Sequence, residues 1–261
     1  MVDLPVRSEI MDQQLIKKAA NDILNSKKTI AFTGAGISVE SGIPDFRGAH
    51  GLWQKYDPEE YAHIQAFYSN PDKVWLMLKD MFELIMTAKP NPAHIGLAEL
   101  ERMGYLSSIV TQNVDGLHQA AGSKKVIEFH GSHRTLSCLK CSHKMDGTSF
   151  AMEDLPARCP RCASLLKPDV VFFGEPIPWE AQVTSLKESK SCTAVLVIGT
   201  SAVVYPAASI PIMAKERGAK VIEINMEPTP LTNQISEYLI CGSAGKIVPA
   251  IVEEVKLQIS R

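Results

Sequence analysis

The sequence predicts an α/β fold: a Rossmann-like parallel sheet with helices on both faces, plus a smaller domain. Short apolar segments rich in β-branched residues alternate with longer amphipathic segments, as expected for strands buried between two layers of helices. Two stretches, 45–88 and 133–167, interrupt this alternation, and the second contains two Cys-x-x-Cys pairs. Both interruptions are therefore predicted to be insertions that form the smaller domain.

Six segments have the composition of buried parallel strands: 29–33, 108–111, 126–129, 194–198, 220–224 and 238–241. Several of them run directly into glycine or polar residues. Ligands of open α/β sheets bind at the carboxyl edge of the strands. The polar residues that follow these strands are therefore the first candidates for a functional site.

Apolar residues at helical spacing predict four helices, at 12–26, 92–103, 207–216 and 246–259. Gly104 and Gly218 follow two of them, where glycine commonly ends a helix. These elements assign the Rossmann-like domain to residues 1–44, 89–132 and 168–261. A mobile loop and helical insertion at 45–88, together with a zinc ribbon at 133–167, are assigned to the small domain.

Composition limits the classes of function. The 261 residues are 45% hydrophobic and 21% charged, with a formal net charge of -2, so nucleic acid is not an expected partner. The first 25 residues lack the features of a signal peptide, and no apolar run is long enough to cross a bilayer. We expect a cytoplasmic protein without a membrane partner. Oligomeric state is not encoded in any visible pattern, and a monomer is compatible with the sequence.

The first chemical motif is a glycine loop, Gly34-Ala35-Gly36, directly after the first predicted strand. Glycine lets main-chain N–H groups approach a pyrophosphate closely. The usual dinucleotide fingerprint has a third glycine, but Val39 stands there, and no acidic residue ends a second strand about 20 residues later. Taken alone, the motif fits a tight strand-to-helix turn without a ligand equally well.

The second motif consists of four cysteines with the spacing of a zinc ribbon: Cys138, Cys141, Cys159 and Cys162. Four thiolates fill every position around a zinc ion and leave none for a catalytic water, so the predicted metal is structural. The alternative is four buried or oxidised cysteines without a metal. His143 lies nearby and is expected to be a solvated loop residue.

The third set of residues follows two neighbouring predicted strands. Gln112, Asn113 and Asp115 come after one strand, and His130 ends another. Amides, a carboxylate and an imidazole at one sheet edge are suited to binding ribose hydroxyls and accepting a proton. Among the histidines, His130 is the candidate base because it ends an apolar strand and precedes a glycine, whereas His118 lies in a predicted helix and is expected only to orient its neighbours.

Together these motifs resemble the sirtuins. The resemblance continues in the order typical of the family and covers nearly the whole chain, through 34–38, 42–48, 111–115, 130–131, the cysteine pairs, 167–175, 199–201, 204–208 and 224–225. It also accounts for Val39, since sirtuins bind NAD with a modified glycine loop. The resemblance implies an NAD-dependent protein lysine deacetylase that needs NAD as cosubstrate and zinc as a structural ion.

In the reaction that the resemblance implies, the oxygen of acetyl-lysine attacks the nicotinamide ribose. Nicotinamide leaves, and free lysine and O-acetyl-ADP-ribose are formed. His130 would be the base, assisted by Asn113 and Asp115. The implied NAD-binding residues are Gly34, Ala35, Gly36, Asp45, Phe46, Arg47, Gln112, Asn113, Asp115, Gly199, Thr200, Ser201, Asn225 and Cys241. The acetylated peptide would bind at Val170, Phe172, Phe173, Gly174, Glu175 and Val203.

The acyl group can be narrowed by the same resemblance. Sirtuins that remove succinyl or malonyl groups carry a Tyr-x-x-Arg pair, and this chain has Leu78 and Met81 at the aligned positions. Neither side chain neutralises a carboxylate as an arginine does. We therefore expect acetyl or other uncharged acyl groups.

Two alternatives remain open at this stage. The first is a mono-ADP-ribosyltransferase that uses the same NAD site. The second is a noncatalytic zinc-ribbon module that binds nucleic acid through Lys140, Lys144, Arg158 and Arg161. These four charges are more typical of a solvated face.

Overall fold

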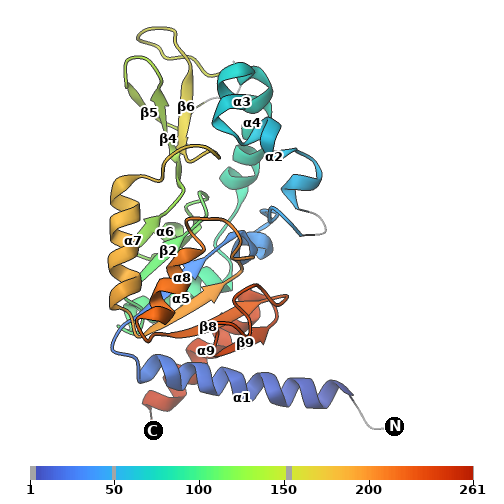
Figure 1. The fold of residues 1–261 in the computed structure, drawn as a ribbon. Helices are drawn as coiled ribbons and strands as arrows, with labels where there is room; N and C mark the ends of the chain where they lie inside the picture. Colours follow the sequence, from blue (N-terminus) through green and yellow to red (C-terminus); the bar gives the residue numbers. More distant parts are fainter. Residues whose placement is uncertain (1–3, 49–50, 151–154, 261) are drawn as a thin grey trace.

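The computed structural model describes residues 4–48, 51–150 and 155–260. Figure 1 shows a parallel sheet flanked by helices and, at the far end of the molecule from helices α1 and α9, a smaller part built from short strands and helices. None of the helices in the described ranges is long and apolar enough to span a membrane.

The main sheet contains six parallel strands in the order β3-β2-β1-β7-β8-β9. Their bounds are β1 Thr29–Thr33, β2 Ser108–Thr111, β3 Val126–Glu128, β7 Ala194–Ile198, β8 Lys220–Asn225 and β9 Tyr238–Cys241. The six predicted strands are confirmed, with small shifts only at the ends of β3 and β8. The strand order reverses between β1 and β7, and the crevice at such a point is where ligands bind in this class of fold.

Strand β1 shows how the sheet is buried. All five of its residues are buried, and neighbouring side chains enter different cores because they point to opposite faces. Ala31 packs in the core that includes residues of α1 (Leu4–Leu24), α5 (Pro92–Arg102) and α9 (Ala244–Ile259). Ile30 and Phe32 pack in the core on the other face, which includes residues of α8 (Ser209–Glu216).

The predicted helices are present with altered bounds. Helix α1 begins at Leu4, earlier than the predicted residue 12, and Gly104 and Gly218 have the left-handed backbone conformation expected just after α5 and α8. Helix α7 (Trp179–Ser191) was not predicted. Its buried positions are Ser185, Glu188 and Ser189, so it lacks the apolar face by which a helix is recognised in a sequence.

The smaller part joins the two insertions. An antiparallel sheet in the order β5-β4-β6 contains β4 (Gly131–Cys138), β5 (Lys144–Asp146) and β6 (Leu166–Val170). It shares one core with α3 (Ile64–Ser69) and α4 (Pro71–Thr87), and α2 (Pro58–Tyr61) precedes them. The predicted fold class, a parallel sheet with a smaller part made of a ribbon and a helical insertion, is confirmed. The exact domain boundaries remain a prediction.

Candidate functional site

A cleft of about 660 Å³ lies at the carboxyl edge of the main sheet, a volume suited to a small ligand. It is lined by the loops after β1, β2, β7 and β8, by His130 after β3, and by residues from the smaller part. Most of the predicted site residues line it: Gly34, Ala35, Gly36, Asp45, Phe46, Arg47, Gln112, Asn113, His130, Val170, Phe172, Phe173, Gly174, Glu175, Gly199, Thr200, Ser201 and Asn225. The sheet edge therefore brings together groups that are far apart in sequence.

The glycine loop packs tightly against the loop after β7. A Cβ atom on Gly34 would lie 2.7 Å from Thr200 Cβ, and one on Gly36 would lie 2.8 Å from the Cα of Gly199. The N–H group of Gly36 donates to the carbonyl oxygen of Gly199 at 2.8 Å. The glycines are thus required for the contact between two loops, and this contact forms a cradle of main chain at the floor of the cleft. After Gly34 the chain forms a 3-10 helix, Ala35–Ser41.

The residues after β2 are fixed by hydrogen bonds to this cradle. Gln112 Nε2 donates to Thr200 Oγ1 at 2.9 Å, and Asn113 Nδ2 donates to the carbonyl oxygen of Gly34 at 3.1 Å. Asp115 does not line the cleft, because its carboxylate accepts from Ser38 Oγ at 2.7 Å and from the N–H group at the start of helix α6 (Leu117–Ala120). A direct contact of Asp115 with a ribose therefore remains a prediction.

His130 is held in one tautomer by the main chain. Its Nδ1 lies 3.1 Å from the carbonyl oxygen of Gln112. Because a carbonyl oxygen only accepts, Nδ1 carries the proton in this contact and Nε2 keeps a lone pair. Burial lowers the pKa of His130 below its ordinary value of 6.5, and the hydrogen bond to Gln112 offsets only part of this effect. The imidazole is therefore a neutral base at neutral pH.

Besides His130, two further histidines, His94 and His118, lie buried beside the cradle. Ser38 Oγ lies 3.5 Å from His94 Nε2, and His118 Nε2 lies 2.9 Å from Thr33 Oγ1. The two imidazole rings are 4.9 Å apart. Burial lowers the pKa of His94 to about 4 and the pKa of His118 to about 3, so both rings are neutral. His118 thus has the supporting place expected for it. His94 was not predicted, because the sequence shows only its place at a helix start after Asn91, and its contact with Ser38 arises in the fold.

The loop that contains Asp45, Phe46 and Arg47 covers part of the cleft. Asp45 Oδ1 accepts from the N–H group of Gly48 at 2.8 Å, which ties the loop to itself. The ring of Phe46 packs against Trp53 at a centroid distance of 5.0 Å. Trp53 also lines the cleft and was not among the predicted residues. A contact of Asp45 with nicotinamide remains a prediction.

One face of α4 forms an apolar wall of the cleft. Its lining residues are Met77, Leu78, Met81, Phe82 and Ile85. Leu78 and Met81 thus line the cleft, as expected from their aligned positions. Arg47 is the single lysine or arginine among the lining residues in the described part of the chain. The wall itself offers no partner for a carboxylate.

Besides Asp115, two further predicted residues do not line the cleft. Val203 is exposed, whereas the next residues, Val204 and Tyr205, line it. The thiol of Cys241 donates to the carbonyl oxygen of Met226 at 3.1 Å, outside the lining set. Lining residues that were missed near these two positions are Met226, Glu227, Gly242, Ser243 and Ala244. Loop turns decide which neighbour faces the cleft, and the sequence pattern does not reveal them.

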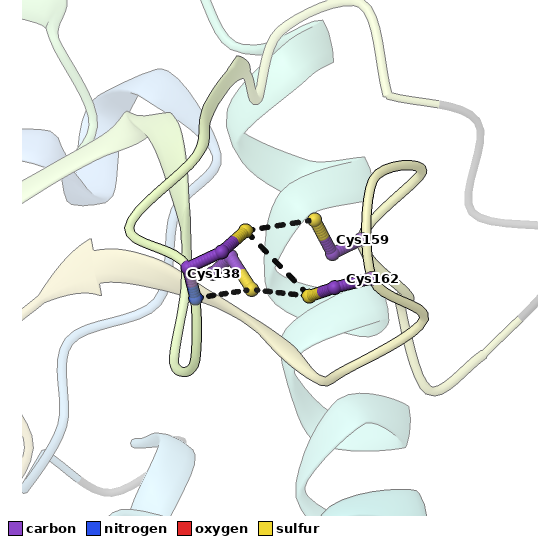
Figure 2. Close-up of side chains that lie close together, drawn as sticks. Cys138, Cys159 and Cys162 are labelled. Atoms are coloured by element: carbon purple, nitrogen blue, oxygen red, sulfur yellow. Dashed lines mark hydrogen bonds between the residues drawn. The ribbon is translucent and has the colours of Figure 1, made fainter.

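The four cysteines come together as predicted. All four sulfur atoms lie within 4.8 Å of one another, and His143 is not part of the group. In Figure 2, Cys138 faces Cys162, which lies beside Cys159 on a later loop. The separations of 3.5 and 3.6 Å between paired sulfurs are close to the roughly 3.8 Å expected for four sulfurs around one zinc ion. The residues therefore fit a structural zinc site.

The basic residues near the zinc site are exposed. Lys140, Lys144, Arg158 and Arg161 all have exposed side chains. Lys144 also pairs with Asp169 at 3.5 Å. This exposure agrees with a solvated face, and nucleic-acid binding by these residues is not tested by the structure.

A six-stranded parallel sheet with a cleft at its strand reversal and a four-cysteine centre defines a Rossmann-like protein with an inserted zinc ribbon. A model of the Sir2 family matches residues 34–206. The chain is 49% identical over 246 residues to NAD-dependent protein deacylase 2 of Archaeoglobus fulgidus, covering 92% of this chain and 96% of that protein.

Solved structures agree with this match. A crystal structure of a Sir2 homologue in complex with NAD has 45% identity and a TM-score of 0.85, covering 95% of each chain. Sir2Af2 bound to a myristoylated histone peptide has 42% identity and a TM-score of 0.81, covering 95% of this chain and 98% of that chain. The chain belongs to the Sir2 family, which confirms the resemblance to the sirtuins.

Metal removal tests the zinc site. We expect about one zinc ion per chain in the purified protein, and we expect Cys159→Ala to lose the metal because three thiolates bind zinc far more weakly than four. The melting temperature should fall by about 10 °C or more. Cys241→Ala, which changes an exposed cysteine outside the group, is the control and should retain the metal. Full zinc content in Cys159→Ala would contradict the assignment.

Proposed function

We propose that this chain is an NAD-dependent protein lysine deacetylase that also removes other uncharged acyl groups. The relative from Archaeoglobus fulgidus is named a deacylase, and a Sir2 homologue binds NAD. One observation carries the proposal: a single cleft is lined by the glycine cradle, by a neutral histidine and by an apolar wall. Location in the cytoplasm remains a further prediction.

Each group of cleft residues has a separate role in the proposed reaction. NAD supplies the reactive ribose carbon and nicotinamide as the leaving group. The cradle at Gly34 and Gly36 holds the pyrophosphate, and Asn113 binds the ribose next to nicotinamide. His130 Nε2 accepts a proton from a hydroxyl of that ribose, because the ring is neutral and its Nδ1 is already committed to Gln112. Phe46 and its neighbour Trp53 exclude water from the reacting carbon.

The apolar wall supports the acyl specificity. Acetyl-lysine enters between α4 and the segment 170–175, where Leu78, Met81 and Phe172 surround the acyl group. The wall continues through five lining residues of α4, which is longer than an acetyl group requires. This length, together with the myristoylated peptide bound to Sir2Af2, favours a second activity on long-chain acyl-lysine.

The role of His130 predicts a specific loss of turnover. His130→Ala should lower kcat with acetylated peptide and NAD at least about a hundredfold, because it removes the proton acceptor. Nicotinamide release and mass spectrometry of acetylated ADP-ribose measure this directly. His143→Ala is the control, since it changes a histidine outside the cleft and outside the metal group. Transfer of label from NAD to protein in excess of deacetylation would instead identify an ADP-ribosyltransferase.

The pH profile tests the same residue. Protonated His130 cannot accept a proton, and its pKa lies below 6.5. For the wild-type chain, the acid-side fall of kcat/KM should therefore have its midpoint below pH 6.5. A midpoint above pH 6.5 would contradict a neutral, buried base.

The acyl wall predicts a preference among matched peptides. With one peptide sequence, kcat/KM for the acetylated form should exceed that for the succinylated form at least about tenfold, because the wall would leave the carboxylate unpaired. Met81→Arg should shift this ratio toward succinyl-lysine, and Met86→Arg, at an exposed position on α4 outside the cleft, should not. Equal turnover of both peptides by the wild-type chain would contradict the assignment.

A further inference from the structure

The segment 170–175 lines the substrate side of the cleft, and its backbone is already partly committed. The N–H group of Phe173 donates to the carbonyl oxygen of Ala62 at 2.8 Å, and the N–H group of Ile64 donates to the carbonyl oxygen of Phe173 at 2.9 Å. The helical insertion therefore holds one edge of the segment. These two bonds fix the centre of the segment. Its first part is held by the N–H group of Val171, which donates to the carbonyl oxygen of His130 at 2.8 Å, and by the pairing of Val170 with Gly131 in the small sheet.

Both ends of the segment are joined by one buried ammonium group. Lys167 is only 8% exposed, and its Nζ donates to the carbonyl oxygens of Pro168 at 3.1 Å and Val170 at 2.9 Å. The same Nζ lies 3.0 Å from Oε2 of Glu175. Two of its three donors are thus used by carbonyl oxygens, and its charge is paired with the carboxylate. Lys167 thus connects the first residue of the segment to the last.

The carboxylate of Glu175 also bonds to the backbone in the middle of the segment. Its Oε2 also accepts from the N–H group of Phe172 at 2.9 Å. The ammonium group of Lys167 lies 4.9 Å from the centroid of the Phe172 ring, within the range of a cation–π contact. Phe172 lines the cleft, so the ion pair also helps to fix one of the side chains that line it.

A buried ion pair is a weak source of net stability, because desolvating two charges costs about as much as their attraction returns. Its effect is on geometry, since each charge is satisfied in only one arrangement. A binding segment that is held in the bound geometry before the ligand arrives loses less entropy on binding. The contacts of Lys167 should therefore increase the affinity of segment 170–175 for a peptide that pairs with it.

We infer that Lys167 is a positioning residue that presets segment 170–175 for the acylated peptide. The inference rests on the proposed function, because it assigns the peptide to that segment. Lys167 does not line the cleft and has no contact with the reacting groups. Its loss should weaken peptide binding while leaving NAD binding and turnover of the bound complex unchanged.

Lys167→Met tests the inference, because methionine keeps the length of the side chain and removes its charge. We expect the Kd and the KM for acetylated peptide to rise about tenfold, the effect of losing a hydrogen-bonded charge. The KM for NAD and kcat should stay within about twofold. Lys144→Met is the matched control on strand β5 of the same sheet, since its ion pair with Asp169 is exposed, and its constants should match the wild type.

If Lys167→Met does not fold, a second variant still tests the inference. Glu175→Gln keeps the shape of the side chain and an oxygen that can accept from the N–H group of Phe172, but it removes the charge that pairs with Lys167, so it should also raise the peptide Kd. Where both variants fold, the double variant should lose less affinity than the two single losses added together, because they break one contact. An unchanged peptide Kd in the folded variants would overturn the inference, and so would equal changes in kcat and both KM values. Wild-type chain that binds the peptide but releases no nicotinamide would instead overturn the proposed function.

Discussion

The close approach of the loops after β1 and β7 is the constraint on which the site depends. These strands are paired in parallel at the point where the strand order reverses, so their loops leave the sheet side by side. Any Cβ atom at Gly34 or Gly36 would collide with the facing loop at less than 3 Å. Only glycine permits the contact, and the contact in turn places Thr200 where Gln112 can bond to it. The close packing of these two backbone loops thus forms the floor of the cleft.

A second constraint joins the two sheets at His130. The N–H group of Val171 donates to the carbonyl oxygen of His130 at 2.8 Å, while the imidazole bonds to Gln112 after β2. Gly131 follows with a positive φ of 76°, and a Cβ atom there would lie 2.0 Å from the carbonyl oxygen of Asp169. The histidine therefore stands where the parallel sheet and the small antiparallel sheet meet. This position supports the proposed mechanism, in which one residue serves both the nucleotide and the acylated peptide.

Much of the fold was predictable because the inner strands of the parallel sheet, such as β1, β2 and β7, are buried on both faces and form short apolar runs in the sequence. Helix α7 was not, because its buried Glu188 is neutralised by Lys28 and Lys125, which are distant in sequence. The same distinction holds in the site. His130 and Asn113 follow strands and so could be placed at the sheet edge, whereas the supporting roles of partners such as His94 arise only from tertiary contacts. The four-cysteine group could be predicted because a zinc ribbon requires two Cys-x-x-Cys pairs at a characteristic spacing in the sequence.

The central claim is that one cleft brings the ribose beside nicotinamide, the acyl-lysine and His130 together. A crystal structure of the chain with an unreactive NAD analogue and acetylated peptide tests this claim most directly. The predicted result is a hydroxyl of that ribose within about 3.2 Å of His130 Nε2, with the acyl group against Leu78 and Met81 on the apolar wall of α4. A ribose bound beyond the reach of that imidazole, or an acyl group outside the wall, would contradict the mechanism.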